Sequence, residues 1–380
     1  MSFLVFNSSI MTALQEAHSQ DELSLGLRSS AQSEWQRGEY ENTQRVKSVN
    51  MTDVISPVAM GEEVWRIWEH AQGIYEQPLV QVRGIVPVDD ERRLRAIAQE
   101  LSVAAETSSG RSSISGRIPF QIDGQAFGLY YVDISSSQRR AYRDNNWMSH
   151  SQAIERGIQK HERFEQRPVP SGFRVAALEI ARGRLRDILT SSDMDLDPEA
   201  VAAEIAELHR LSFAYPHDPT QQTAEGAFAI MSANPTLVAF DPDMRVASVG
   251  YLEQDTRFSF ADMRLIEPTY FTHPGEQYRR HGLSSHLRQA TQQLVRHGYN
   301  SETYNGDPLI VFNESIRNTS FPLCIANGCR IAGTHDGSIS GNLGDAYTAI
   351  GPANPEIGYM PMGLTYTADP RIELQLPGSY

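Results

Sequence analysis

The sequence predicts a mixed α/β (α+β) fold, and three observations support this. Residues 78–134 show a β-α-β-β pattern, a helix follows a capping aspartate at position 197, and residues 261–298 show a strand, a loop and an amphipathic helix. The 380 residues are 40% hydrophobic and 21% charged, which is typical of a globular protein of two or three domains. We divide the chain into a polar N-terminal extension (1–72), a small α/β domain (73–165), a main α/β domain (170–350) and a C-terminal tail (351–380).

The first 170 residues contain the N-terminal extension and the small domain. Residues 1–70 are polar, and we expect irregular structure there apart from one helix. The segment 136–172 is polar and charged, and its proline-rich end favours a domain boundary because prolines break helices. The expected elements are a helix around Met60–Ala71, a strand over Pro78–Val86, a helix over Asp89–Ala105, and strands over Ile118–Ile122 and Phe127–Ile134.

The main domain begins near Phe173, where Phe173–Leu189 is a strand or a helix. Asp197 is a good N-cap and Pro198 suits the first helical position, so a helix begins there. Its expected buried stripe is Val201, Ile205, Leu208 and Leu211. Two alternating strands, Thr236–Phe240 and Val246–Leu252, follow.

The second half of the main domain continues with a strand over Ala261–Thr272 and a helix over Gly282–His297. Every third or fourth residue of that helix is apolar, which predicts one buried face (Leu283, Leu287, Ala290 and Leu294). Further expected elements are extended segments at Asn300–Tyr304 and Leu309–Phe312, a helix over 316–327 and a strand at Arg330–Gly333.

The loop between that strand and that helix has the features of an anion site. The first N–H groups of a helix have no intrahelical acceptor, and together with the helix dipole they bind phosphate. Gln277, Arg279 and Arg280 add donors and positive charge, and Gly282 allows close approach of the backbone. The loop suits the pyrophosphate of a nucleotide-like cofactor; the alternative is a plain strand–loop–helix turn with a basic surface.

The loop sequence Arg279-Arg280-His281-Gly282-Leu283-Ser284 resembles the signature Gln/Arg-x-x-Gly-x-Gly/Ala of the GNAT acetyltransferase superfamily. It fits at Arg279 and Gly282 and departs at Ser284. Within the superfamily the chain is most similar to β-lysine N6-acetyltransferase-like proteins, through residues 207–216 and 271–274.

The resemblance implies a mixed sheet whose central fourth and fifth strands splay apart, with acetyl-CoA in the gap. The pantetheine arm would pair with the backbone of Tyr270, Phe271 and Thr272, and an N–H of Phe271 or Thr272 would stabilise the oxyanion. Asn318 would hold the cofactor arm. The residues expected around the pyrophosphate are Gln277, Tyr278, Arg279, Arg280, His281, Gly282, Leu283 and Ser284.

The acceptor amine must lose a proton before it attacks a thioester, so the site needs a base or a water chain. Glu267 on the fourth strand and Glu302 near the fifth are the candidate bases, and Tyr304 could return a proton to the leaving thiolate. The alternative for each glutamate is a solvated strand face. The implied activity is acetyl transfer to a primary amine of a small amino-acid-like molecule.

Composition excludes several other classes. The net charge of −14 disfavours nucleic-acid binding, two cysteines exclude a disulfide framework, and no apolar run is long enough for a membrane span. The sequence therefore favours a cytoplasmic enzyme without a metal site, and edge strands allow a homo-oligomer. Two alternatives remain: a non-catalytic module that keeps the fold, and an acyltransferase acting on a protein or a modified nucleic-acid base.

Overall fold

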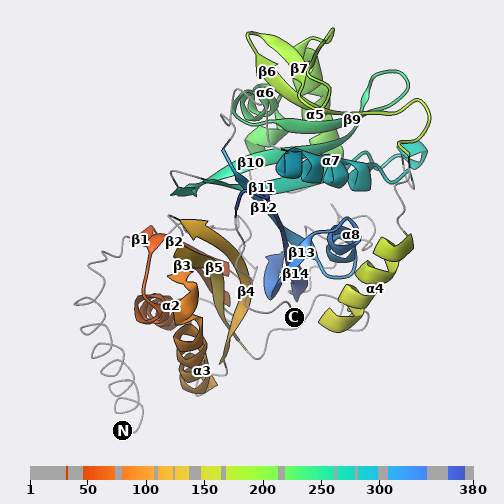
Figure 1. Cartoon of the computed structure of the whole chain (residues 1–380). Helices are drawn as coiled ribbons and strands as arrows, with labels where there is room; N and C mark the ends of the chain where they lie inside the picture. Colours follow the sequence, from red (N-terminus) through yellow and green to blue (C-terminus); the bar gives the residue numbers. More distant parts are fainter. Residues whose placement is uncertain are drawn as a thin grey trace.

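The computed structural model describes residues 31–32, 46–72, 79–106, 110–122, 125–136, 147–163, 168–212, 219–260, 263–278, 281–297, 307–339 and 358–372. Over these residues the strands form one mixed sheet of 14 strands. Its order is β1-β2-β3-β5-β4-β13-β14-β12-β11-β10-β9-β6-β7-β8, so the N-terminal strands lie at one end and β6 to β8 at the other (Figure 1). The mixed α/β fold predicted from the sequence is confirmed.

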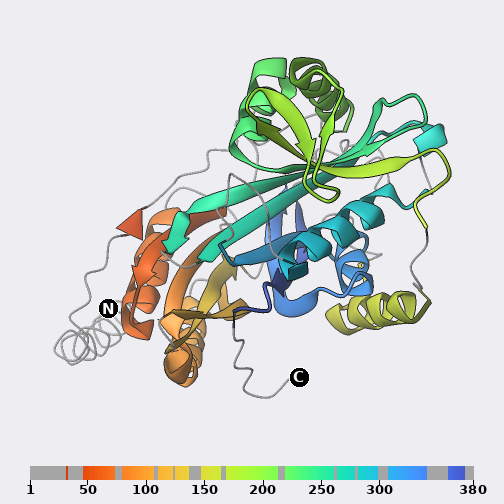
Figure 2. The same cartoon turned by 45° about the horizontal axis from the view of Figure 1, so that its top comes forward.

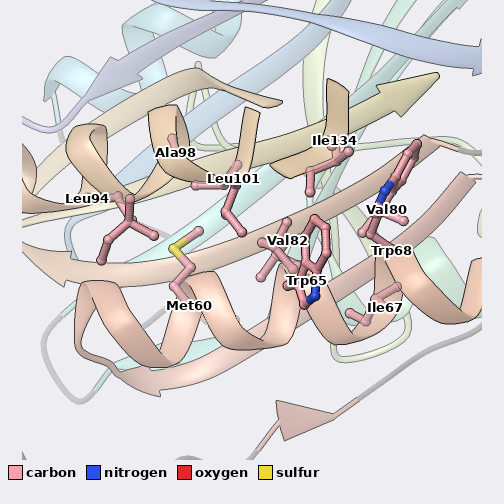
Figure 3. Close-up of a cluster of buried hydrophobic side chains, with 14 of the residues drawn as sticks. Met60, Trp65, Ile67, Trp68, Val80, Val82, Leu94, Ala98, Leu101 and Ile134 are labelled. Carbon is pink, nitrogen blue, oxygen red and sulfur yellow. The ribbon is translucent and has the colours of Figure 1, made fainter. Parts of the chain in front are cut away.

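Residues 46–136, here termed the N-terminal unit, fold as a four-stranded sheet with two helices on one face. Figure 3 shows Trp65 beside Val82 and Trp68 beside Val80 in the cluster between these layers. The helix and strand types expected here are confirmed, but β2 was not predicted. The elements are β2 (Val46–Val54), α2 (Pro57–Gln72), β3 (Leu79–Pro87), a 3₁₀ turn (Val88–Asp90), α3 (Glu91–Glu106), β4 (Gly110–Ile122) and β5 (Gln125–Ser136); the two-residue strand β1 (Ala31–Gln32) pairs with β2.

Residues 168–372 form the C-terminal unit. Helices α5 and α6 cover one face of its strands, while α7 packs on the opposite face. Its elements are β6 (Arg174–Ala181), β7 (Arg184–Asp187), β8 (Ser192–Met194), α5 (Pro198–Ser212), 3₁₀ turn η2 (Pro219–Gln222), α6 (Ala224–Ala233), β9 (Thr236–Phe240), β10 (Val246–Phe260), β11 (Met263–Thr272), 3₁₀ turn η3 (Glu276–Tyr278), α7 (Leu283–His297), β12 (Leu309–Ile316), α8 (Ser320–Ala326), β13 (Arg330–Ile339) and β14 (Gly358–Ala368).

Helix α5 begins as the sequence predicts, because the N–H of Glu199 donates to Asp197 Oδ1 at 3.1 Å. The buried face of α5 differs from the predicted one at one residue. Leu211 is 47% exposed, so its assignment to the buried stripe was wrong. His209 is buried instead, with its ring edge-on to Phe271 at 5.0 Å between centroids.

The two units share a hydrophobic core. Ile85 and Tyr131 of the N-terminal unit pack in one cluster with Leu265, Ile310 and Phe312 of the C-terminal unit. The sheet itself continues from β4 to β13 at the pair Gly116–Gly333, and a Cβ on Gly116 would collide with the side chain of Leu364. Glycine at this position therefore allows the two sheets to meet, and Figure 2 shows the N-terminal strands running up to the C-terminal unit.

Besides β2 and the short strands β1 and β8, three further helices and strands of the described residues were not predicted from the sequence. One is α6, and another is α4 (His150–Arg163), which packs on α8 through Ala153 and Phe321. The third is β14, which pairs with both β12 and β13 in the middle of the sheet, although the sequence division placed these residues in a C-terminal tail.

Candidate active site

Strands β11 and β12 run parallel and pair over only three residues. The pairs are Arg264–Leu309, Leu265–Ile310 and Ile266–Val311. Beyond them β11 remains paired with β10 as far as Thr272, and β12 remains paired with β14 as far as Ile316. Within the described part of the chain, the two central strands therefore separate after Ile266 and leave a gap between them.

Pro268 explains where the separation begins. The N–H of Arg264 donates to Pro308 O at 2.9 Å, so the even-numbered residues of β11 direct their backbone groups toward β12. After Ile266 the next residue facing β12 is Pro268, which has no N–H to donate. The parallel ladder stops at this point because the donor that would continue it is missing.

The same alternation identifies the backbone groups that face the gap. The N–H of His273 donates to Ala247 O, so odd-numbered residues of β11 face β10. Phe271 therefore directs its N–H into the β10 ladder, and its expected role as oxyanion donor was wrong. The N–H groups of Tyr270 and Thr272 face the gap.

The N-terminus of α7 lies just after this strand. Gly282 has φ +72°, and a Cβ built on it meets no heavy atom within 4 Å, so the space beside its backbone is open. Leu283 is buried and anchors the first turn, Ser284 is half-buried, and His281 is exposed with its ring 5.2 Å from that of Phe173.

The loop before α7 is fixed to the neighbouring β9–β10 turn. The hydroxyl of Tyr278 donates to Asp241 Oδ2 at 2.8 Å, and Asp241 Oδ1 also accepts the N–H groups of Asp243 and Arg245. Burial and this hydrogen bond raise the pKa of Tyr278. Gln277 is exposed in the same 3₁₀ turn.

On the side covered by α7, a buried arginine joins both strands. Arg288 lies over the ring of Tyr270 at 4.2 Å, and its Nη1 donates to Asn313 Oδ1 at 3.3 Å and to Cys324 Sγ at 3.1 Å. The Tyr270 hydroxyl lies 2.7 Å from Thr291 Oγ1, and burial raises its pKa.

Cys324 is a buried free cysteine whose thiol is surrounded by donors. Its pKa is lowered to about 5 by a hydrogen bond from Cys329 and by the charge of Arg288, which outweigh burial. The same hydrogen bond and burial raise the pKa of Cys329 well above its ordinary value. The structure thus places the thiol of Cys324 next to the guanidinium of Arg288.

On the opposite side, Glu267 faces the N-terminal unit. Its Oε2 lies 3.8 Å from Arg83 Nη1, and the Nη2 of Arg83 donates to Glu314 Oε1 at 2.7 Å. Glu267 follows directly after the last β11–β12 pair, so its carboxylate lies at the start of the gap. This contact shows that the side chain of Glu267 lies on the face of β11 opposite to α7.

The structure places the other expected residues as follows. Asn318 lies in the turn before α8, where its Oδ1 accepts the N–H of Met148 at 2.8 Å. Glu302, Tyr304, Arg279 and Arg280 lie outside the described residues.

Sequence reasoning missed Arg83, Arg288, Cys324 and Glu314 as site residues. The expected strand at Leu309–Phe312 ended before Glu314, whereas β12 continues to Ile316. Arg83 comes from a different unit, and no local pattern could have indicated its contact with β11 and β12.

Two further properties concern other classes of protein. No helix among the described residues is long and apolar enough to cross a membrane. In the same residues, no three His, Cys, Asp or Glu side chains are grouped so that they could hold a metal ion.

No protein-family model and no curated protein matches the chain. Solved structures of acetyltransferases do match over about half of it. The ribosomal-protein-S5-alanine acetyltransferase from Vibrio fischeri is 11% identical, with 54% of this chain and 97% of that chain covered and a TM-score of 0.34. A GCN5-related N-acetyltransferase from Kribbella flavida is 17% identical (52% and 99% covered, TM-score 0.33). The acetyltransferase yncA from Salmonella typhimurium, solved with its cofactor acetyl-CoA, is 15% identical (48% and 95% covered, TM-score 0.33).

Proposed function

We propose that this protein is an acetyl-CoA-dependent N-acyltransferase that moves an acetyl group to a primary amine of a small amino-acid-like substrate. The amine attacks the thioester directly. The observation that carries the proposal is the gap between β11 and β12, which opens at Pro268 and continues to the end of β11, before the loop that leads into α7. Proteins similar to β-lysine N6-acetyltransferase are the proposed functional relatives, and the cytoplasm is the proposed location.

The residues around the gap fit acetyl-CoA. The space beside the backbone of Gly282 is open, and it adjoins the free N–H groups expected at a helix N-terminus. Tyr270 and Thr272 present backbone donors and acceptors along an edge of β11 that β12 does not use, which suits an amide-containing arm lying as an added strand. Tyr278 fixes the loop between these two parts.

Bound acetyl-CoA would supply an acyl group already activated as a thioester. The chain supplies the other requirements of the reaction. The N–H of Tyr270 or Thr272 stabilises negative charge that develops on the carbonyl oxygen. Glu267, 35% exposed at the start of the gap, accepts the proton of the incoming ammonium directly or through water. Glu302 remains a second candidate base and Tyr304 a candidate proton donor.

Calorimetric titration with CoA tests the binding step. Gly282→Asn keeps a residue type that tolerates positive φ but places a side chain in the open space beside the backbone, so it should weaken CoA binding at least tenfold. Gly183→Asn is the matched control, because Gly183 has φ +76° and the same open surroundings in the β6–β7 turn. Equal affinity of both variants and wild type, or no CoA binding by wild type, would contradict the proposal.

A screen of small primary amines with acetyl-CoA, read by mass spectrometry of the products, tests the transfer step. Acetylation of at least one amine supports the enzyme. CoA binding without transfer to any amine, peptide or nucleoside would instead support a non-catalytic module.

A further inference from the structure

The N-terminal unit reaches the candidate active site through one side chain. On β3, Arg83 lies on the same face as Ile85, which packs in the core shared with β11 and β12. The next positions on the facing surfaces of β11 and β12, beyond Leu265 and Phe312, are Glu267 and Glu314. Arg83 therefore lies where the shared core ends and the gap begins.

The guanidinium of Arg83 is held on several sides. It lies 5.1 Å from the ring centroid of Tyr131 and 5.9 Å from that of Phe312, and the side chain is only 9% exposed. Its two terminal nitrogens contact residues of different strands. Nη2 pairs with Glu314 on β12, and Nη1 lies near Glu267 on β11. A planar guanidinium can make two such contacts at once, whereas an ammonium is a single point of charge.

We infer that Arg83 is a positioning residue for Glu267, an inference that rests on the proposed function in which Glu267 is the general base. Held by Glu314 and the two rings, Arg83 fixes the Glu267 carboxylate at the start of the gap. The N-terminal unit thereby completes the active site. Proton removal from the amine depends on a residue that lies 184 positions earlier in the chain (267 − 83).

Steady-state kinetics of the full chain test this inference. Arg83→Met removes the charge and keeps the bulk, and it should lower kcat at least tenfold while the affinity for CoA changes less than twofold. Arg83→Lys restores one charge contact and should recover part of kcat. A purely structural role would change CoA affinity and thermal stability along with kcat.

Arg117→Met is the matched control, because Arg117 pairs with Glu91 within the N-terminal unit. It should lower stability and leave kcat unchanged. If Arg83→Met behaves like Arg117→Met in an active wild-type background, the positioning role is overturned. A wild-type protein that acetylates no amine would overturn the proposed function itself, so the two failures are distinguishable.

Discussion

The guanidinium of Arg288 stacks on the ring of Tyr270, 4.2 Å from its centroid. Arg288 comes from α7 and Tyr270 from β11, and the same guanidinium reaches Asn313 on β12. One buried cation therefore joins the helix to both separated strands. Arg288 also donates to the thiol of Cys324. The pKa of that thiol depends on the charges around it, so the effect of replacing Arg288 can be measured by titrating Cys324.

Arg288→Met should raise the pKa of Cys324, because the positive charge next to the thiolate is lost while burial remains. At neutral pH the ultraviolet absorbance of the thiolate should fall. Arg296→Met, an exposed arginine on the same helix, is the control and should titrate like wild type. If the pKa of Cys324 measured in Arg288→Met equals that of wild type, the charge of Arg288 does not lower the pKa of this thiol.

Cys324 also gives the protein a pH-dependent stability. Its folded-state pKa is about 5, against an ordinary value of 9.0. Between these values the unfolded chain binds a proton that the folded protein does not, so stability from this group rises with pH and is lost as the pH falls toward 5. Cys324→Ser should remove a slope of at most ~1.4 kcal/mol per pH unit in the free energy of unfolding.

Urea unfolding at several pH values measures that slope. Cys329→Ser is the control, because a serine hydroxyl can still donate to Cys324 and most of the slope should remain. A slope in Cys324→Ser equal to that of wild type would assign the pH dependence to other groups.

Pro268→Val should partly close the gap. Valine favours strands and restores an N–H directed at β12, so the ladder could continue toward Phe312. We expect CoA affinity to fall about tenfold, or ~1.4 kcal/mol, without loss of thermal stability. Thr269→Val, whose backbone faces β10, should leave CoA binding unchanged. Wild-type affinity in Pro268→Val would show that the missing donor does not set the width of the gap.

Tyr278→Phe should loosen the loop before α7. It removes the hydrogen bond to Asp241, for a loss of about 1 kcal/mol in the free energy of unfolding. CoA affinity should fall about fivefold, or ~1 kcal/mol. Tyr130→Phe removes a similar bond, to Glu91 in the N-terminal unit, and should lower stability alone. If both variants bind CoA equally well, the Tyr278 anchor has no role in binding.

The sequence predicted those elements whose local signals agree with their tertiary surroundings. Helix α7 is an example, since Leu283, Leu287, Ala290 and Leu294 are all buried as their spacing indicates. Helix α5 shows the limit of such a pattern. A buried histidine at position 209 completes the stripe that Leu211 was expected to complete, because residues 201, 205, 208 and 209 lie on one helical face.

The elements that were missed have weak local signals. Helix α4 is mostly polar, and it packs on α8 at Gly157, where a Cβ would lie 2.7 Å from Ile325 Cβ. Strand β14 contains Pro361 and Gly363, which local pattern reasoning takes as turn residues. Gly363 is required there by Phe321, whose ring lies within 2.5 Å of a built Cβ. Gly157 and Gly363 are therefore needed because elements distant in sequence pack closely against them, which a local pattern does not reveal.

For the site, the sequence indicated the loop, the helix N-terminus and a glutamate on the strand before it. It could not indicate Arg83, whose partners are set by how the two units pack. It also suggested Phe271 as a backbone donor, which the alternation of the ladder excludes.

Strand β14 joins β12 to β13, and β13 in turn meets the N-terminal sheet at Gly116. During synthesis, β4 emerges from the ribosome more than 200 residues before β14 (358 − 122). The continuous sheet can form only once residue 368 has been translated. Until then, the edge strand of the N-terminal sheet has no partner strand. Nascent chains stalled before this strand should therefore depend most on chaperones.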